Sequence, residues 1–237
     1  MSGKKARAKR QAAAPPRVRA KSRASQRAGI SRTGGTSLAV VVVAVVGLYF
    51  LSSYHHSSPG TSGAAGSSAY PYAVGSPGPG QKAPDVNLPA TSGGSFNLAS
   101  YRGRKPVLLY FQEGLTCQPC WDQISAIQKD DAKFRALGIG PIVSITTDPL
   151  GEITQKAHDE GFSIPVLSDQ GGRVSDSYSA RNYGMMGHDR DGHTFVLVGS
   201  DGKILWRADY GGAPKYTMFV PVDVLLAQLK AHAGGKP

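Results

Sequence analysis

The sequence predicts an α/β fold in which helices cover both faces of a mixed β-sheet, preceded by one transmembrane helix. Three observations lead to this prediction. Strand-like and helix-like segments alternate along the second half of the chain and end in a hairpin and a helix. An apolar strand runs into a helix at a Cys-x-x-Cys pair, and a valine-rich window without charge follows a basic N-terminus.

Residues 1–36 contain eleven basic residues and no acidic one, whereas the remainder of the chain carries 16 of each. The net charge of +11 therefore belongs to this tail. Its other residues are mostly Ala, Ser, Gly and Pro, which cannot build a core, so we expect a disordered cytoplasmic tail. A basic tail can touch nucleic acid, but the next segment explains it better, and we expect no nucleic-acid partner.

Residues 37–54 are predicted to form a transmembrane signal anchor in the lipid bilayer. The apolar run Leu38–Leu51 is short for a span of about 20 residues, but the uncharged window Thr33–Tyr54 is long enough. The basic tail predicts a single-pass protein of the cell membrane with a cytoplasmic N-terminus and an extracytoplasmic C-terminal domain. The alternative is a signal peptide cleaved near residues 64–69.

Residues 55–80 are rich in Ser, Gly and Pro and predict a flexible linker, and residues 81–232 predict one domain large enough to bury a core. Alternation and turn residues predict strands at 83–88 and 95–98, joined by a turn at 92–94. Uncharged β-branched runs predict buried strands at 107–111, 142–147 and 165–167. The Asp201-Gly202 turn predicts a hairpin of 193–198 with 203–207. Helical periodicity predicts helices from Pro119 and at 152–160, 172–183 and 222–230.

Cys117 and Cys120 lie where the strand Val107–Phe111 gives way, after a short polar turn, to the first of these helices. The N–H groups at a helix start carry the positive end of the dipole and favour the thiolate of Cys117. Cys120 follows one turn later on the same face, where it can attack a mixed disulfide formed at Cys117. The pattern predicts a redox dithiol.

Two alternative roles for the cysteine pair remain open. The pair can be half of a zinc site, although the chain has no third cysteine to complete one. It can also be a structural disulfide, although so small a ring restricts the unfolded chain little. We expect no metal and no cofactor.

These segments resemble the thioredoxin superfamily. The residues that carry the resemblance are Ala83-Pro84-Asp85 with Leu88, Leu98–Gly103, Val107–Phe111, Cys117-Gln118-Pro119-Cys120, Thr194–Val198 and Ser200–Lys203. Similar proteins are membrane-tethered thiol-disulfide oxidoreductases and the alkyl hydroperoxide reductase/thiol-specific antioxidant (peroxiredoxin-like) branch. The resemblance implies a thioredoxin-like fold, with Cys117 as the attacking thiol and Cys120 as the resolving thiol.

The chain departs from the family pattern at two positions. The family usually has a cis-proline, or in peroxiredoxins an arginine, just before the strand that matches 193–198, and here that position falls near Gly192. A peroxidatic cysteine normally has Thr or Ser three residues before it, whereas Gly114 precedes Cys117 at that distance. The second departure makes peroxidase chemistry the weaker interpretation.

Several other residues are candidates for the site. Proton transfer needs a nearby base, for which Glu113 and Asp122 are candidates. We expect the loop 183–193 and the segment 210–213 to flank the dithiol. The residues predicted to be adjacent to the substrate are Thr116, Pro119, Trp121, Met185, Met186, His193, Tyr210 and Gly211.

The sequence thus predicts an extracytoplasmic, membrane-tethered thiol-disulfide oxidoreductase that uses a Cys-Gln-Pro-Cys dithiol. Its expected partners are a thiol or disulfide protein substrate and a membrane or extracytoplasmic thiol electron donor. The alternatives are a peroxiredoxin-like thiol peroxidase and a copper-binding module. Copper is considered because the loop 185–193 contains methionine sulfur and imidazole, which are soft ligands.

Overall fold

The computed structural model describes residues 69–233. The predicted basic tail and transmembrane anchor, and most of the predicted linker, lie outside the described residues. In residues 69–233, no helix is long and apolar enough to cross a membrane.

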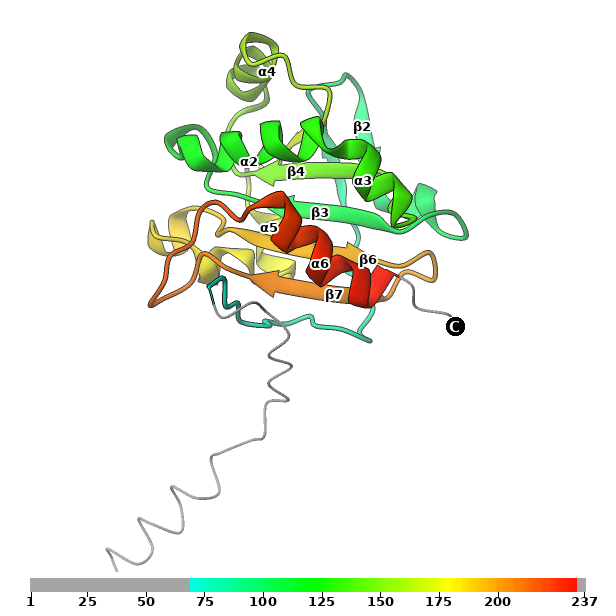
Figure 1. Cartoon of the computed structure of the whole chain (residues 1–237). Coiled ribbons are helices and arrows are strands. Elements are labelled where there is room, and N and C mark those ends of the chain that lie inside the picture. Colours follow the sequence, from blue (N-terminus) through cyan, green and yellow to red (C-terminus); the bar gives the residue numbers. More distant parts are fainter. Residues whose placement is uncertain (1–68, 234–237) are drawn as a thin grey trace, which may run out of the picture. The chain divides into compact units, whose positions relative to one another are not determined.

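A five-stranded mixed sheet lies at the centre of the domain, with the strand order β5-β4-β3-β6-β7 (Figure 1). The strands β5, β4 and β3 are parallel to one another, β6 runs antiparallel to β3, and β7 runs antiparallel to β6. All five residues of the central strand β3 are buried, as its uncharged sequence predicts. The strands are β3 (Val107–Phe111), β4 (Ile142–Thr146), β5 (Val166–Ser168), β6 (Thr194–Val198) and β7 (Ile204–Asp209).

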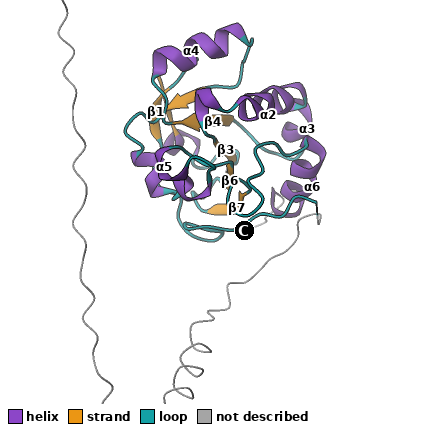
Figure 2. Ribbon diagram, turned by 90° about the vertical axis from the view of Figure 1, so that its left-hand side faces the viewer, coloured by secondary structure: helices purple, strands orange, loops and turns teal. Residues whose placement is uncertain are grey.

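Helices cover both faces of this sheet, which confirms the predicted thioredoxin-like α/β class. Helices α2 (Gln118–Lys129), α3 (Asp131–Ala136) and α6 (Val222–Ala233) lie on one face (Figure 2). Helix α5 (Arg173–Ser177) and the hairpin of β1 (Asn87–Pro89) and β2 (Ser95–Asn97) lie on the other. Helix α4 (Leu150–Asp159) packs beside β5.

Each face has its own apolar core because successive residues of a strand point to opposite sides. Tyr110 and Phe195 face α2 and α6, whereas Leu109 and Val196 face the hairpin and α5. Four short 3₁₀ helices complete the fold: η1 (Leu98–Tyr101), η2 (Gly114–Thr116), η3 (Ala180–Tyr183) and η4 (Gly187–Asp189).

The single helix predicted at 172–183 is wrong, because two short helices occupy this segment. Helix α5 ends at Ser177, Ser179 has a positive φ of 50°, and η3 follows. The break lets Tyr178 turn into the core, where its hydroxyl donates to the carbonyl oxygen of Pro84 at 2.8 Å. The helix that carries the cysteines likewise ends at Lys129, and α3 continues after Asp130.

The described end of the predicted linker packs along the edge strand β7. The N–H and C=O groups of Ala73 pair with Asp209, and Gly80 donates its N–H to Ile204. The ring of Tyr72 lies edge-on to Trp206 and Tyr210. This segment packs along β7 because β7 is an edge strand with unpaired backbone groups, and because the ring of Tyr72 supplies apolar area that covers the edge.

Candidate active site

Cys117 and Cys120 form a disulfide at the end of β3 where α2 begins, with their Cα atoms 5.4 Å apart. Cys117 is the residue just before the first turn of α2, and Pro119 lies in that turn. Cys117 retains 6% exposure, whereas Cys120 is fully buried. The predicted position of the pair at a strand-to-helix junction is confirmed, and the more accessible of the two cysteines is the one at the helix start.

The turn before Cys117 is held by Asp148 at the end of β4. Asp148 Oδ2 accepts the backbone N–H of Leu115 at 2.7 Å and the hydroxyl of Thr146 at 3.1 Å. Gly114 has a φ of +85°, and a Cβ atom there would lie 1.7 Å from Asp148 Oδ2. Glycine is therefore required at this position by both backbone conformation and space.

Glu113 fastens the loop 183–193 to the cysteine turn. Its buried carboxylate accepts the backbone N–H of Met185, and its carbonyl oxygen accepts from Arg190 Nη1 at 3.4 Å. Arg190 also forms an ion pair with Asp148. Two contacts thus join the loop to Glu113, whose side chain is buried, and a third joins it to Asp148.

The other predicted proton-transfer residue, Asp122, lies on the exposed side of α2 and accepts a hydrogen bond from Gln118 Nε2 at 3.0 Å. Thr116 and Pro119 are also exposed, beside Cys117 in the chain. Met185 and Met186 are 55% and 53% exposed, on the loop held by Glu113. Thr116, Pro119, Met185 and Met186 remain candidates for contact with a partner molecule.

Three residues predicted to be adjacent to the substrate have structural roles instead. Trp121 is fully buried, donates Nε1–H to Gly114 O at 2.9 Å and stacks on Phe162. Tyr210 is buried and donates its hydroxyl to Gln228 of α6. A Cβ atom on Gly211 would lie 2.1 Å from Tyr183 O, so this glycine permits close backbone packing. All three residues are buried, so the structure gives no support to their predicted contact with a substrate, which stays a prediction.

His193 is also fully buried, under the cysteine helix. Its Nδ1 lies 2.9 Å from the hydroxyl of Tyr110, which in turn lies 3.3 Å from the carbonyl oxygen of Cys120. Nε2 has no hydrogen-bond partner among the described residues. Burial lowers the pKa of His193 to about 3, so the ring is neutral at pH 7.

Met218 is a site residue that sequence reasoning missed. It forms a small buried cluster with Cys117 and Cys120, separate from the two large cores. The residue lies about 100 positions from the cysteines, in the segment between β7 and α6. No local sequence pattern identifies Met218 as a site residue. The one available signal was that an apolar residue stands between turn-forming residues and a predicted helix.

Asp191 forms a second buried polar group, near the start of β6. Its Oδ2 lies 2.9 Å from Ser175 Oγ, which also lies 2.8 Å from Asp169 Oδ2. Burial raises the pKa of Asp191 to about 8, the hydrogen bond with Ser175 lowers this pKa in part, and the charge of Asp169 raises it by a smaller amount. When Asp191 is protonated, its carboxyl group can donate a hydrogen bond to Ser175 Oγ. The hydroxyl of Ser175 can then donate its own hydrogen to Asp169 Oδ2.

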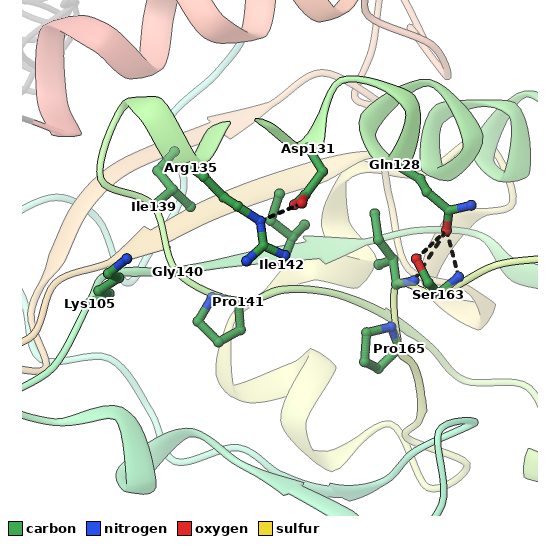
Figure 3. A pocket seen from close by; sticks show the side chains of 11 residues that line it. Lys105, Gln128, Asp131, Arg135, Ile139, Gly140, Pro141, Ile142, Ser163 and Pro165 are labelled. Atoms are coloured by element: carbon green, nitrogen blue, oxygen red, sulfur yellow. Dashed lines mark hydrogen bonds and ion pairs between the residues drawn. The ribbon is translucent and has the colours of Figure 1, made fainter. Parts of the chain in front are cut away.

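A groove of about 490 Å³ lies at the other end of the sheet, where β4 and β5 begin (Figure 3). Four of its polar side chains already pair with one another. Arg135 pairs with Asp131, and Gln128 accepts from Ser163 (Figure 3). Since the cysteines lie at the carboxyl end of β3, this groove is not part of the dithiol site.

Comparison with known proteins agrees with this arrangement. A model of the AhpC/TSA family matches residues 79–207. Two Mycobacterium tuberculosis proteins that bear the name peroxiredoxin, from strains CDC 1551 / Oshkosh and H37Rv, are each 33% identical over 133 residues. That match covers 54% of this chain and 82% of each relative.

Solved structures show the same fold. The crystal structure of peroxidoxin BcpB from Mycobacterium tuberculosis aligns with a TM-score of 0.55 and 23% identity, over 65% of this chain and 97% of that one. The crystal structure of a protein titled as thiol:disulfide interchange protein DsbE, from Chlorobium tepidum, aligns with a TM-score of 0.51 and 25% identity. It covers 68% of this chain and all of that protein.

Proposed function

Since the chain belongs to the AhpC/TSA family and is an oxidoreductase, we propose that it exchanges thiols and disulfides with a partner protein through Cys117 and Cys120. The observation that carries the proposal is the disulfide between these residues at the start of α2. One of the two cysteines, Cys117, keeps 6% exposure to solvent, and an exchanging dithiol needs access for its partner.

The proposed exchange runs in two steps. A thiolate of the electron donor attacks Cys117 Sγ, the bond to Cys120 breaks, and Cys120 leaves with the electron pair. A second donor thiolate then attacks the donor's own sulfur in the mixed disulfide, so the donor leaves oxidised and Cys117 is released as a thiolate. The N–H groups at the start of α2 stabilise the Cys117 thiolate. The reverse sequence oxidises a partner dithiol.

The alternative is a thiol peroxidase, which the names of the Mycobacterium tuberculosis relatives favour. Two features of the site argue against it. Gly114 stands where the family usually has Thr or Ser, and space around Asp148 excludes a larger residue there. Peroxiredoxins usually have an arginine just before the strand that matches 193–198. The arginine near that position here, Arg190, has its guanidinium paired with Asp148. We therefore propose disulfide exchange as the main activity.

We also propose that the domain is held outside the cytoplasm by a membrane anchor at residues 37–54. The support is the basic excess of residues 1–36 ahead of an uncharged window. A membrane or extracytoplasmic thiol then serves as electron donor. Protease added to cells without their wall should remove the C-terminal domain, and complete protection of that domain would exclude this topology.

The activity is tested on the full chain in detergent. Dithiothreitol should reduce its disulfide, and the dithiol that results should in turn reduce a protein disulfide such as that of insulin. Cys117→Ser should abolish both reactions. Peroxide consumption with the same donor should be no faster than for free cysteine. If Cys120→Ser consumes peroxide with an external thiol at the wild-type rate, the peroxidase alternative is correct instead.

A further inference from the structure

We propose that the reduced protein binds one Cu(I) ion through Cys117 Sγ, Cys120 Sγ and Met218 Sδ. This site goes beyond disulfide exchange, and its ligand set differs from the methionine and histidine loop that the sequence suggested. Three sulfur-containing side chains form a cluster of their own, apart from the two apolar cores. Thiolate and thioether sulfurs are the ligands that select Cu(I).

The two cysteines can reach the same ion. Their sulfurs are bonded in the disulfide, and their Cα atoms lie 5.4 Å apart on consecutive turns of chain. Reduction by a donor dithiol, which becomes a disulfide, gives two thiols at this spacing. Copper binding then displaces their two protons and leaves the metal in the +1 state.

Met218 is held against the cysteines by its neighbours on both sides. The N–H of Thr217 donates to Tyr210 O at 3.1 Å, at the end of β7. The N–H of Val220 donates at 2.7 Å to Gln123 Oε1, on the helix that carries Cys120. These two bonds hold the backbone on both sides of Met218 before a metal arrives, which reduces the entropic cost of binding.

Access and charge also suit a single monovalent ion. Cys117 and Met218 keep 6% and 8% exposure, which gives the ion a way in, whereas Cys120 closes the inner side. Two thiolates and one Cu⁺ leave one negative charge, which lies at the positive end of the α2 dipole. In residues 69–233, no group of three or more His, Cys, Asp or Glu side chains offers a competing set of metal ligands.

The exposed methionines of the neighbouring loop provide a matched control. Met186 is 53% exposed and is not part of the sulfur cluster. Met218→Leu keeps the volume of the side chain and removes the ligand, Met218→His supplies a different ligand, and Met186→Leu makes the same chemical change outside the cluster.

The experiment is an anaerobic titration of the reduced full chain with Cu(I), in competition with the chelator bathocuproine disulfonate. We expect one copper per chain, with affinity at least tenfold lower in Met218→Leu, unchanged in Met186→Leu and largely restored in Met218→His. X-ray absorption should count three sulfur ligands in the wild type and two in Met218→Leu.

Equal copper affinity in the wild type and Met218→Leu would overturn the proposal, as would two sulfur ligands in the wild type. The number of sulfur ligands in the wild type tests the proposal even if Met218→Leu does not fold. Disulfide exchange is measured without copper on the wild type, so loss of the copper site leaves the proposed activity standing, and the reverse also holds.

Discussion

The hydroxyl of Tyr110 lies 2.9 Å from Nδ1 of His193, in the interior of the domain directly under the helix that carries the cysteines. This hydroxyl is also 3.3 Å from the carbonyl oxygen of Cys120. The central strand and the start of β6 are therefore joined to the active-site helix by one buried tyrosine. A change at this tyrosine affects both the stability of the domain and the surroundings of the resolving cysteine.

Tyr110→Phe is expected to lower the free energy of unfolding by about 1–3 kcal/mol, because it leaves the imidazole of His193 without a partner on either nitrogen. Thermal or chemical unfolding of the full chain measures this loss of free energy. His193→Leu in the Tyr110→Phe background should cost less than His193→Leu alone. Equal costs would show that the two side chains are not coupled.

Cys120→Ser should trap partner proteins as mixed disulfides through Cys117, whereas Cys117→Ser should trap none. The reason is that Cys117 retains exposure at the helix start and Cys120 has none. Non-reducing gels of membranes from cells that express each variant give the measurement. Trapping by Cys117→Ser at the level of Cys120→Ser would reverse the assignment of the two roles.

Asp148→Asn should slow disulfide exchange several-fold and destabilise the domain by about 1–3 kcal/mol, because Asp148 holds Leu115 N–H, Thr146 and Arg190 around the cysteine turn. Asp122→Asn is the matched control. Asp122 is exposed and contacts Gln118, so we expect a change within about 0.5 kcal/mol. A slower exchange in Asp122→Asn at unchanged stability would instead support its predicted role in proton transfer.

The stability of the domain should decrease between pH 6.5 and pH 8. Asp191 has a pKa of about 8 when folded, so the folded state keeps a proton that the unfolded chain, with a pKa near 3.8, has lost. Stability therefore falls as pH rises toward 8, by at most about 1.4 kcal/mol per pH unit. His193 has the opposite effect below pH 6.5, since its pKa is lowered to about 3.

Asp191→Asn should remove the decrease between pH 6.5 and pH 8 because the amide does not titrate. Thermal unfolding measured at half-unit steps from pH 5 to pH 8.5 gives the comparison. An equally steep decrease in the variant would assign the pH dependence to another group.

The double variant Met185→Ser/Met186→Ser should slow the reduction of insulin several-fold and leave the melting temperature within a degree or two. Both side chains are more than half exposed, and the loop that carries them is fastened beside the cysteine turn by Glu113. Reduction by dithiothreitol is the control, because a small dithiol needs no such surface. Unchanged insulin reduction would remove these methionines from the partner-binding surface.

Much of the fold followed from local patterns. The uncharged strand Val107–Phe111, the Asp201-Gly202 hairpin and the helix after Pro119 are all present, because strand and helix periods are set within a few residues. The prediction failed at Ser179, where a helical pattern is interrupted because Tyr178 reaches a distant carbonyl group at Pro84. That contact joins residues 94 positions apart, and no short window contains it.

By itself, the sequence determined that two cysteines stand at a strand-to-helix junction, and it favoured a redox dithiol over a zinc site or a structural disulfide. The tertiary structure alone decided what surrounds them. In the folded domain Tyr210 and His193 are buried, and Glu113 accepts a hydrogen bond from the backbone N–H of Met185. Met218 forms a cluster with the two cysteines. The physical reason is that a residue's burial depends on which distant surfaces pack against it, whereas chain direction and secondary structure depend on its neighbours in sequence.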